Sequence, residues 1–160
     1  MNRLTLAIAD RLVDEALNEG ARQSFAPLCV AVLDAGGHLL ALKRDERASL
    51  LRPQIANGKA SSVLNMGFGG RELARRAALM PAFFSALGGL AGGNMLPVPG
   101  GVLIRNQAGE ILGALGVSGD TSDNDEKCAL AAISAAGLTA DTGALTDPQE
   151  PPRANEPVPQ

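Results

Sequence analysis

Three side chains in this 160-residue chain are best suited to chemistry: a histidine, an aspartate and a lysine. His38 is the only histidine and follows Asp34 across a short glycine turn, which places an imidazole near a carboxylate, as proton transfer or ligand binding would require. The simpler interpretation is that Asp34 caps the turn through its own side chain and that His38 bonds to the backbone. Both interpretations stay open at this point.

Lys59 occupies an unusual position for a lysine. In a helix over residues 53–66 it falls in the same apolar stripe as Ile55, so its amine must reach solvent, find a partner or project into a polar pocket. In a pocket it would be a cation waiting for a carboxylate, a propionate or a phosphate. Lys59, His38 and Asp34 are therefore the candidate catalytic residues.

Glycines mark two further segments. Gly116 stands within an expected strand, where glycine lowers stability unless a helix or a ligand must approach the backbone closely, and Ser118 follows it. The stretch 88–101 is rich in glycine around Asn94 and is expected to be a lid or a surface loop. The predicted ligand-binding residues are His38, Lys59, Asn94, Gly100, Gly116 and Ser118.

Several other chemistries lack their motifs. The chain has no GxGxxG that opens a helix after a strand, no phosphate loop and no metal-ligand cluster, so dinucleotide, nucleotide and zinc sites have no support. Cys29 and Cys128 lack both metal and disulfide spacing, which predicts a reducing cytoplasm. Charges interrupt the N-terminal apolar pattern, and no run reaches the roughly 20 apolar residues of a membrane span, so neither a signal peptide nor a membrane partner is expected.

Composition limits the partners and the size of the core. Aromatic residues make up 2% of the chain, with no Tyr or Trp, and the formal net charge is −3. Single-strand nucleic-acid binding uses aromatic platforms on a basic groove, so nucleic acid is not an expected partner. Five of the ten prolines lie in residues 147–160. We therefore expect one domain over residues 1–146 and a disordered proline-rich tail.

Hydrophobic periodicity predicts the elements that position these residues. Helical spacing covers residues 4–21, 53–66, 71–79 and 122–136, the last with Ser122 as N-cap and Asp125 in a near capping box. Short apolar runs predict five strands, at residues 28–33, 38–43, 95–98, 102–105 and 110–118. A hairpin and a three-strand meander flanked by helices indicate an α+β fold with an antiparallel sheet.

Four segments together resemble the GlcG/HbpS family, whose domain also forms the C-terminus of PduO proteins. They are AVLDAGGHLLALKRDE at 31–46, GKA at 58–60, LPVPGGVLI at 96–104 and ILGALGVSG at 111–119, followed by an acidic pair. The likeness covers nearly the whole expected domain in the same order, and it is weakest between residues 67 and 94.

The resemblance implies a profilin-like sandwich that assembles into homo-oligomers as large as octamers. It also implies haem or corrinoid binding, redox sensing outside the cell, and a link to the catabolism of glycolate, diols or aromatic acids. The haem-ligating histidine of the family lies in or near the N-terminal helix, where residues 1–25 of this chain contain no histidine. His38 would be the metal ligand if haem is bound.

Three functions follow as hypotheses. The first is an oligomeric small-molecule-binding protein whose ligand is haem or a small carboxylic or aromatic acid. The second is a cofactor-independent isomerase, lyase or hydrolase in which Lys59 anchors a substrate while His38 and Asp34 move protons. The third is an assembly protein with glycine-rich subunit interfaces. Binding ranks first because the sequence holds no nucleophile constellation.

Overall fold

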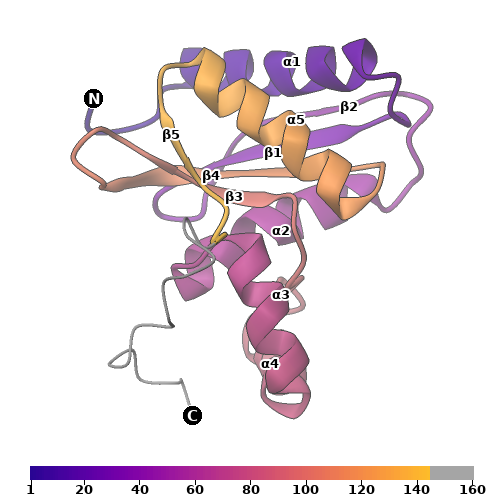
Figure 1. The fold of residues 1–160 in the computed structure, drawn as a ribbon, viewed down its shortest axis with the longest axis vertical. Helices are drawn as coiled ribbons and strands as arrows, with labels where there is room; N and C mark the ends of the chain where they lie inside the picture. Colours follow the sequence, from indigo (N-terminus) through magenta and orange to yellow (C-terminus); the bar gives the residue numbers. More distant parts are fainter. Residues whose placement is uncertain (145–160) are drawn as a thin grey trace.

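The computed structural model describes residues 1–144 as three layers, with an antiparallel five-stranded sheet between two groups of helices (Figure 1). The strands are β1 (Cys29–Asp34), β2 (Leu39–Arg44), β3 (Gly101–Arg105), β4 (Ile111–Ser118) and β5 (Thr139–Asp141), in the order β2-β1-β4-β3-β5. The helices are α1 (Leu6–Arg22), α2 (Arg52–Met66), α3 (Gly70–Leu79), α4 (Pro81–Leu90) and α5 (Ser122–Ala135). The expected α+β class and the antiparallel sheet are confirmed.

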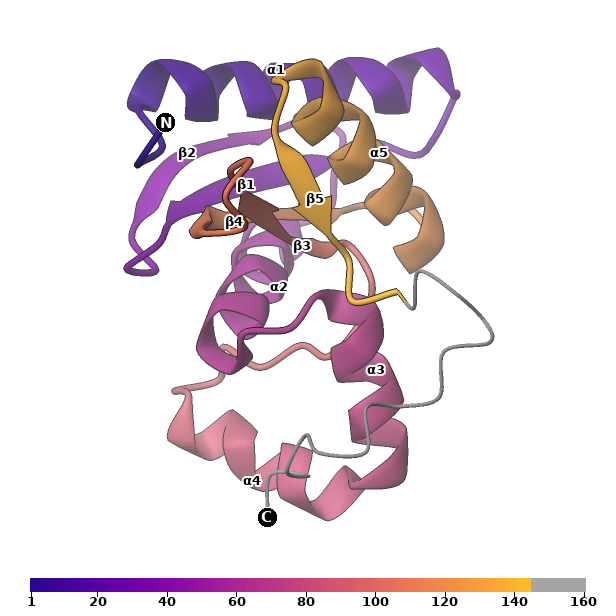
Figure 2. The same ribbon diagram turned by 60° about the vertical axis from the view of Figure 1, so that its left-hand side comes forward.

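The two groups of helices lie on opposite faces of the sheet. Figure 2 shows α1 and α5 on one side and α2 to α4 on the other, with α3 and α4 extending away from the strands. Successive side chains of β1 point to opposite faces of the sheet. Val30 and Val32 pack in the core under α1 and α5, whereas Ala31 and Leu33 face α2. The predicted strand buried on both faces is confirmed, and it pairs with β4, the middle strand of the sheet.

The predicted hairpin between the first two strands is also confirmed. The Asp34 N–H donates to the His38 carbonyl at 2.9 Å, and the Gly37 N–H donates to the Asp34 carbonyl at 3.0 Å. Gly37 has φ +83°, a left-handed conformation that glycine adopts without steric cost. Asp34 and His38 therefore lie at the tip of the β1–β2 hairpin.

One of the five predicted strands is wrong. Residues 95–98 form no strand, because Pro97 has no N–H for a sheet ladder, and the Leu96 N–H donates instead to the Ser62 hydroxyl at 2.7 Å. The fifth strand is β5, which pairs with β3. The predicted boundary at residue 146 and the predicted tail lie outside the described residues.

The structure also revises the start of α5 and the glycine-rich stretch. Thr121, not Ser122, is the N-cap, and its hydroxyl accepts the Asn124 N–H at 3.2 Å. The stretch 88–101 is not one loop, because Gly88 and Gly89 complete α4, a helix that the sequence analysis missed. Within residues 1–144, no helix is long and apolar enough to cross a membrane.

Candidate functional site

The structure places the predicted site residues in two groups at opposite ends of β1. In the register of β1 with β4, Asp34 lies opposite Gly113, whereas Cys29 lies opposite Ser118. Six residues of extended strand separate the two ends by about 17 Å. The hairpin tip and the Ser118 end are therefore two separate sites.

At the tip, the Asp34 carboxylate holds the turn. Its Oδ1 accepts the N–H groups of Gly36 and His38, both at 2.9 Å. The bond from the His38 N–H is the main cause that lowers the pKa of Asp34 from its usual value. Asp34 thus caps the turn as an ionised carboxylate, which is the simpler of the two sequence interpretations.

The His38 side chain projects from this turn into solvent, with 81% of it exposed. Its Nδ1 lies 3.3 Å from Asp34 Oδ1, and Nε2 has no partner among residues 1–144. The imidazole therefore lies beside a carboxylate and has its second nitrogen accessible to solvent.

A cavity of about 470 Å³ adjoins the hairpin tip, and we call it the hairpin cavity. Gly36 and Gly37 form its edge on the hairpin side, and the His38 ring lies 3.0 Å from the place where a Cβ on Gly36 would be. Helix α2, helix α4 and the loop before residue 96 form the other walls. Of the predicted ligand-binding residues, Asn94 lines this cavity.

The lining of the hairpin cavity is uncharged. Leu87 and Leu90 of α4 supply aliphatic surface, and Ser61 and Asn65 of α2 supply hydroxyl and amide groups. The thioethers of Met66 and Met95 also line the cavity. Such a lining suits a ligand that combines apolar surface with neutral hydrogen-bonding groups.

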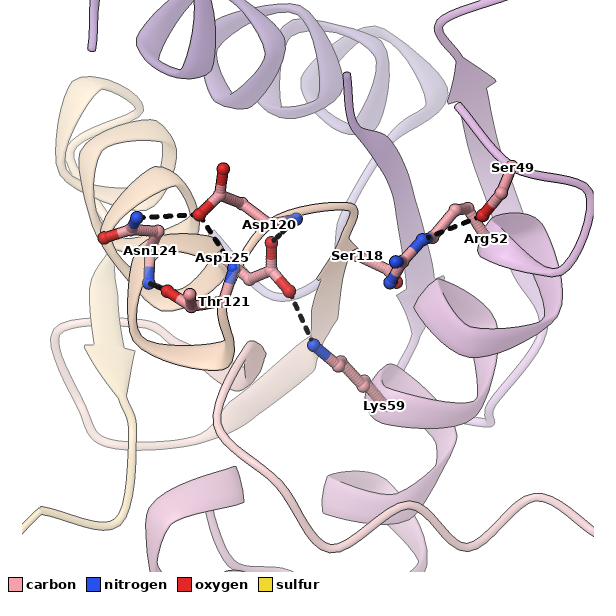
Figure 3. A network of polar contacts seen from close by, with 8 residues as sticks. All are labelled: Ser49, Arg52, Lys59, Ser118, Asp120, Thr121, Asn124 and Asp125. Carbon is pink, nitrogen blue, oxygen red and sulfur yellow. Dashed lines mark hydrogen bonds and ion pairs between the residues drawn. The ribbon is translucent and has the colours of Figure 1, made fainter. Parts of the chain in front are cut away.

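The second group surrounds Lys59, which is buried and paired. Lys59 Nζ lies 2.8 Å from Asp125 Oδ2, with the two side chains 4% and 1% exposed (Figure 3). Asp125 Oδ1 accepts the Asp120 N–H at 3.0 Å. Burial raises the pKa of Asp125, while the Lys59 ammonium opposes that rise. The lysine therefore has an internal carboxylate partner, and this pair joins α2 to α5.

The other predicted residues of this group also hold helices against the sheet. A Cβ on Gly116 would lie 2.0 Å from the Ala56 carbonyl oxygen, so α2 packs directly on β4 at this glycine. Ser118 is fully buried and accepts a hydrogen bond from Arg52 Nη1 at 3.0 Å. Gly100 has φ +105° and lies beside Lys59 Nζ. Close helix packing, the alternative left open above, accounts for Gly116.

Sequence reasoning missed the carboxylate that matters most here. Asp125 was assigned to a helix cap, and a buried partner for Lys59 was only one of three alternatives left open. It also missed the α4 wall of the hairpin cavity. Within residues 1–144, no group of three or more His, Cys, Asp or Glu side chains is arranged to hold a metal ion.

Comparison with known families settles the ancestry of the chain. The family model described as haem degrading protein HbpS-like matches residues 4–134. The chain belongs to the HbpS-like family. No curated protein matches it.

Solved structures agree with this assignment. HbpS of Streptomyces reticuli, as a variant with two Glu-to-Asp changes, is 26% identical over 84% of this chain and 88% of its own, with a TM-score of 0.73. The fold is shared with a structure described as a PduOC–haem complex, at 24% identity, 86% and 97% coverage and a TM-score of 0.76. It is also shared with Klebsiella pneumoniae ORFY, at 23% identity, 86% and 92% coverage and a TM-score of 0.75.

Proposed function

We propose that this HbpS-like protein binds a small, mostly apolar ligand in the hairpin cavity, and that haem is the first ligand to test. The observation that carries the proposal is an uncharged cavity of about 470 Å³ with an accessible imidazole beside its edge. Ligand sites are typically concave and mostly apolar, with volumes of roughly 300–1,000 Å³. The description of the matched family and the haem complex of PduOC support haem as the candidate.

The residues present fit haem by the chemistry of their donor atoms. Histidine and methionine are both ligands of haem iron in proteins, and His38 lies beside the edge of the cavity while Met66 and Met95 line it. We propose His38 Nε2 as the iron ligand, with Asp34 holding the ring from Nδ1. Bound haem would supply a redox-active iron. Leu87 and Leu90 of α4 would contact the macrocycle.

Catalysis by Lys59, His38 and Asp34 remains a second prediction, in which His38 and Asp34 are in contact but Lys59 pairs with Asp125 instead. Lys59 is 3% exposed and forms an ion pair with Asp125, and it does not line the hairpin cavity. We propose instead that Lys59 positions α2 against α5. A small carboxylic or aromatic acid remains the alternative ligand to haem.

Self-assembly is also a proposal. Strand β2 lies at the edge of the sheet, and Leu39 on it is 54% exposed, while Leu50 and Leu51 in the following turn are 87% and 65% exposed. An edge strand beside exposed leucines favours contact with a second copy of the chain. The assembly hypothesis and the homo-oligomer both rest on this surface and on the family resemblance.

Titration with hemin tests the proposed function. We expect a saturable shift of the Soret band in the natural protein and at least a tenfold loss of affinity, about 1.4 kcal/mol, in His38→Ala. Ser61→Phe fills the cavity from α2 and should abolish saturable binding. Its matched control is Ser134→Phe, which places the same side chain on an exposed position of α5 and should bind as the natural protein does.

Two results would overturn the proposal. One is the absence of a saturable Soret shift in the natural protein. The other is equal affinity in Ser61→Phe and Ser134→Phe, which would place the haem outside the hairpin cavity. Thermal unfolding of each variant should accompany the titration, since only folded variants report on the cavity.

A further inference from the structure

Three residues lie side by side across one end of the sheet. Arg44 of β2 pairs with Cys29 of β1, and Cys29 pairs with Ser118 of β4. Residues directly opposite each other in antiparallel strands point to the same face of the sheet. That face carries α2, because Cys29 forms a buried cluster with Ala56 of this helix. The Arg44 side chain therefore lies on the α2 face, at the opposite end of β1 from the hairpin cavity.

A second arginine reaches this row of residues from α2. Arg52, the first residue of the helix, donates from Nη1 to the Ser118 hydroxyl at 3.0 Å and from Nε to the Ser49 hydroxyl at 3.1 Å (Figure 3). Ser118 is fully buried, so this contact fixes one side of the guanidinium against the sheet. Nη2 of Arg52 has no hydrogen-bond partner among residues 1–144 and is available to a ligand.

The turn between β2 and α2 holds Arg44. Its Nη1 donates to the carbonyl oxygens of residues 45, 46 and 48, at 3.1, 3.2 and 2.8 Å. Residue 48 is followed by Ser49, which binds Arg52, so the same short turn contacts both guanidinium groups. The Arg44 guanidinium also lies close enough to Cys29 to oppose the rise that burial causes in the pKa of that thiol. The two arginines therefore lie on either side of Cys29.

Neither of these two arginines is neutralised by an acid. No carboxylate within residues 1–144 forms an ion pair with Arg44 or Arg52. The nearby acids have other partners: Asp45 binds Arg47 through Nε at 3.0 Å and Nη2 at 2.9 Å, and Asp125 is bound by the lysine of the buried ion pair described above. Two like charges that contact one turn repel each other, and a bound anion would remove this repulsion.

We propose that Arg44 and Arg52 bind a phosphate group on the surface between the end of β2 and the start of α2. Arg44 is exposed and offers the N–H groups of Nε and Nη2, and Arg52 offers Nη2. Arginine forks match the oxygens of phosphate, and one doubly charged phosphate would neutralise both guanidinium groups. The exposed Ser49 hydroxyl accepts from Arg52 and keeps its own proton for a phosphate oxygen. The site is distinct from the hairpin cavity and adds to the proposed function.

Calorimetric titration of the full chain with inorganic phosphate tests this site, at low salt and about pH 8, where phosphate is mostly doubly charged. Nitrate is the singly charged comparison, and methyl phosphate tests whether the group belongs to an organic molecule. Arg44→Gln and Arg52→Gln each remove one cation, whereas Arg44→Lys and Arg52→Lys keep the charge and lose the fork. Arg3→Gln is the matched control for charge removal, because Arg3 is exposed and has no ion pair within residues 1–144.

We expect phosphate to saturate the natural protein and Arg3→Gln with equal affinity, and nitrate to bind at least about tenfold more weakly. Each glutamine variant should lose at least about tenfold in affinity, and each lysine variant should fall between the natural protein and the glutamine variant. Thermal unfolding shows which variants are folded, and the lysine variants carry the comparison if a glutamine variant is not. Ser61→Phe should bind phosphate normally, which separates this site from the hairpin cavity.

Three results would overturn the proposal: absence of saturable phosphate binding, equal affinity for nitrate, and unchanged affinity in the folded variants of Arg44 and Arg52. Methyl phosphate identifies the source of the group in a protein that passes these tests. Tighter binding than inorganic phosphate would support an organic phosphate as the ligand, and weaker binding would support the free ion.

Discussion

At the scale of single residues, the most informative side chain is Lys59. Its place in an apolar helical stripe was predicted from the sequence, and its burial follows from that pattern. Its partner could not be predicted, because Asp125 lies 66 residues away and only the packing of α5 brings it near. The same limit applies to His38, for which the hairpin was predictable and the adjoining cavity was not.

The buried Lys59–Asp125 ion pair should contribute to the stability of the folded protein. Lys59→Met should lower the free energy of unfolding by about 3–5 kcal/mol, because it leaves a buried carboxylate without its counter-charge. Adding Asp125→Asn removes that charge and keeps an oxygen for the Asp120 N–H, so the double variant should be more stable than Lys59→Met alone. Urea unfolding measures the free energy of unfolding of the single and the double variant. A cost below about 1 kcal/mol, or strictly additive effects, would contradict the assigned role.

The two thiols should be inert in the folded protein. Burial raises the pKa of Cys29 to about 11 and that of Cys128 to about 12. An aromatic disulfide reagent should therefore modify both thiols in the unfolded chain and neither in the folded protein at pH 7. Because the pKa values of the two thiols are higher in the folded than in the unfolded chain, their contribution to the free energy of unfolding is fully present below about pH 8.5. It is lost as the pH rises towards 11. Rapid modification of the folded protein at pH 7 would refute this.

At the scale of elements, prediction succeeded where a segment had a clear hydrophobic pattern. It failed where the segment was very short or rich in glycine. Strand β1 was predictable from an unbroken apolar run between turn residues. Strand β5 has only three residues, too few to show alternation. Helix α4 ends in glycines that favour a loop, although Pro81 at its first turn is a helix-start signal.

Glycine substitutions test the packing of α2 on β4. Gly116→Ala should destabilise the protein by about 1–3 kcal/mol, because its Cβ would collide with the Ala56 carbonyl. Gly88→Ala is the matched control, since it lies in α4 with open space around it, and alanine should stabilise that helix by up to about 1 kcal/mol. Denaturant unfolding compares the two variants. Equal effects on the free energy of unfolding would mean that α2 is not in close contact at Gly116.

At the scale of the whole molecule, the β1–β2 hairpin carries a hollow at each end, one beside α2 and α4 and the other beside α1. The family and the fold class were predictable, because the segments that resemble the family form the sheet and α2. The location of the hairpin cavity was not predictable, because one of its walls is α4, which falls in residues 67–94, where the resemblance is weakest.

A crystal structure of the protein crystallised with haem shows whether the ligand occupies the hairpin cavity. We expect density for the macrocycle between α2 and α4, with the iron bound by His38 Nε2 and the edge of the ring near Asn94. Density at α1, or a haem whose iron is bound by another residue while the hairpin cavity stays empty, would overturn the proposed function.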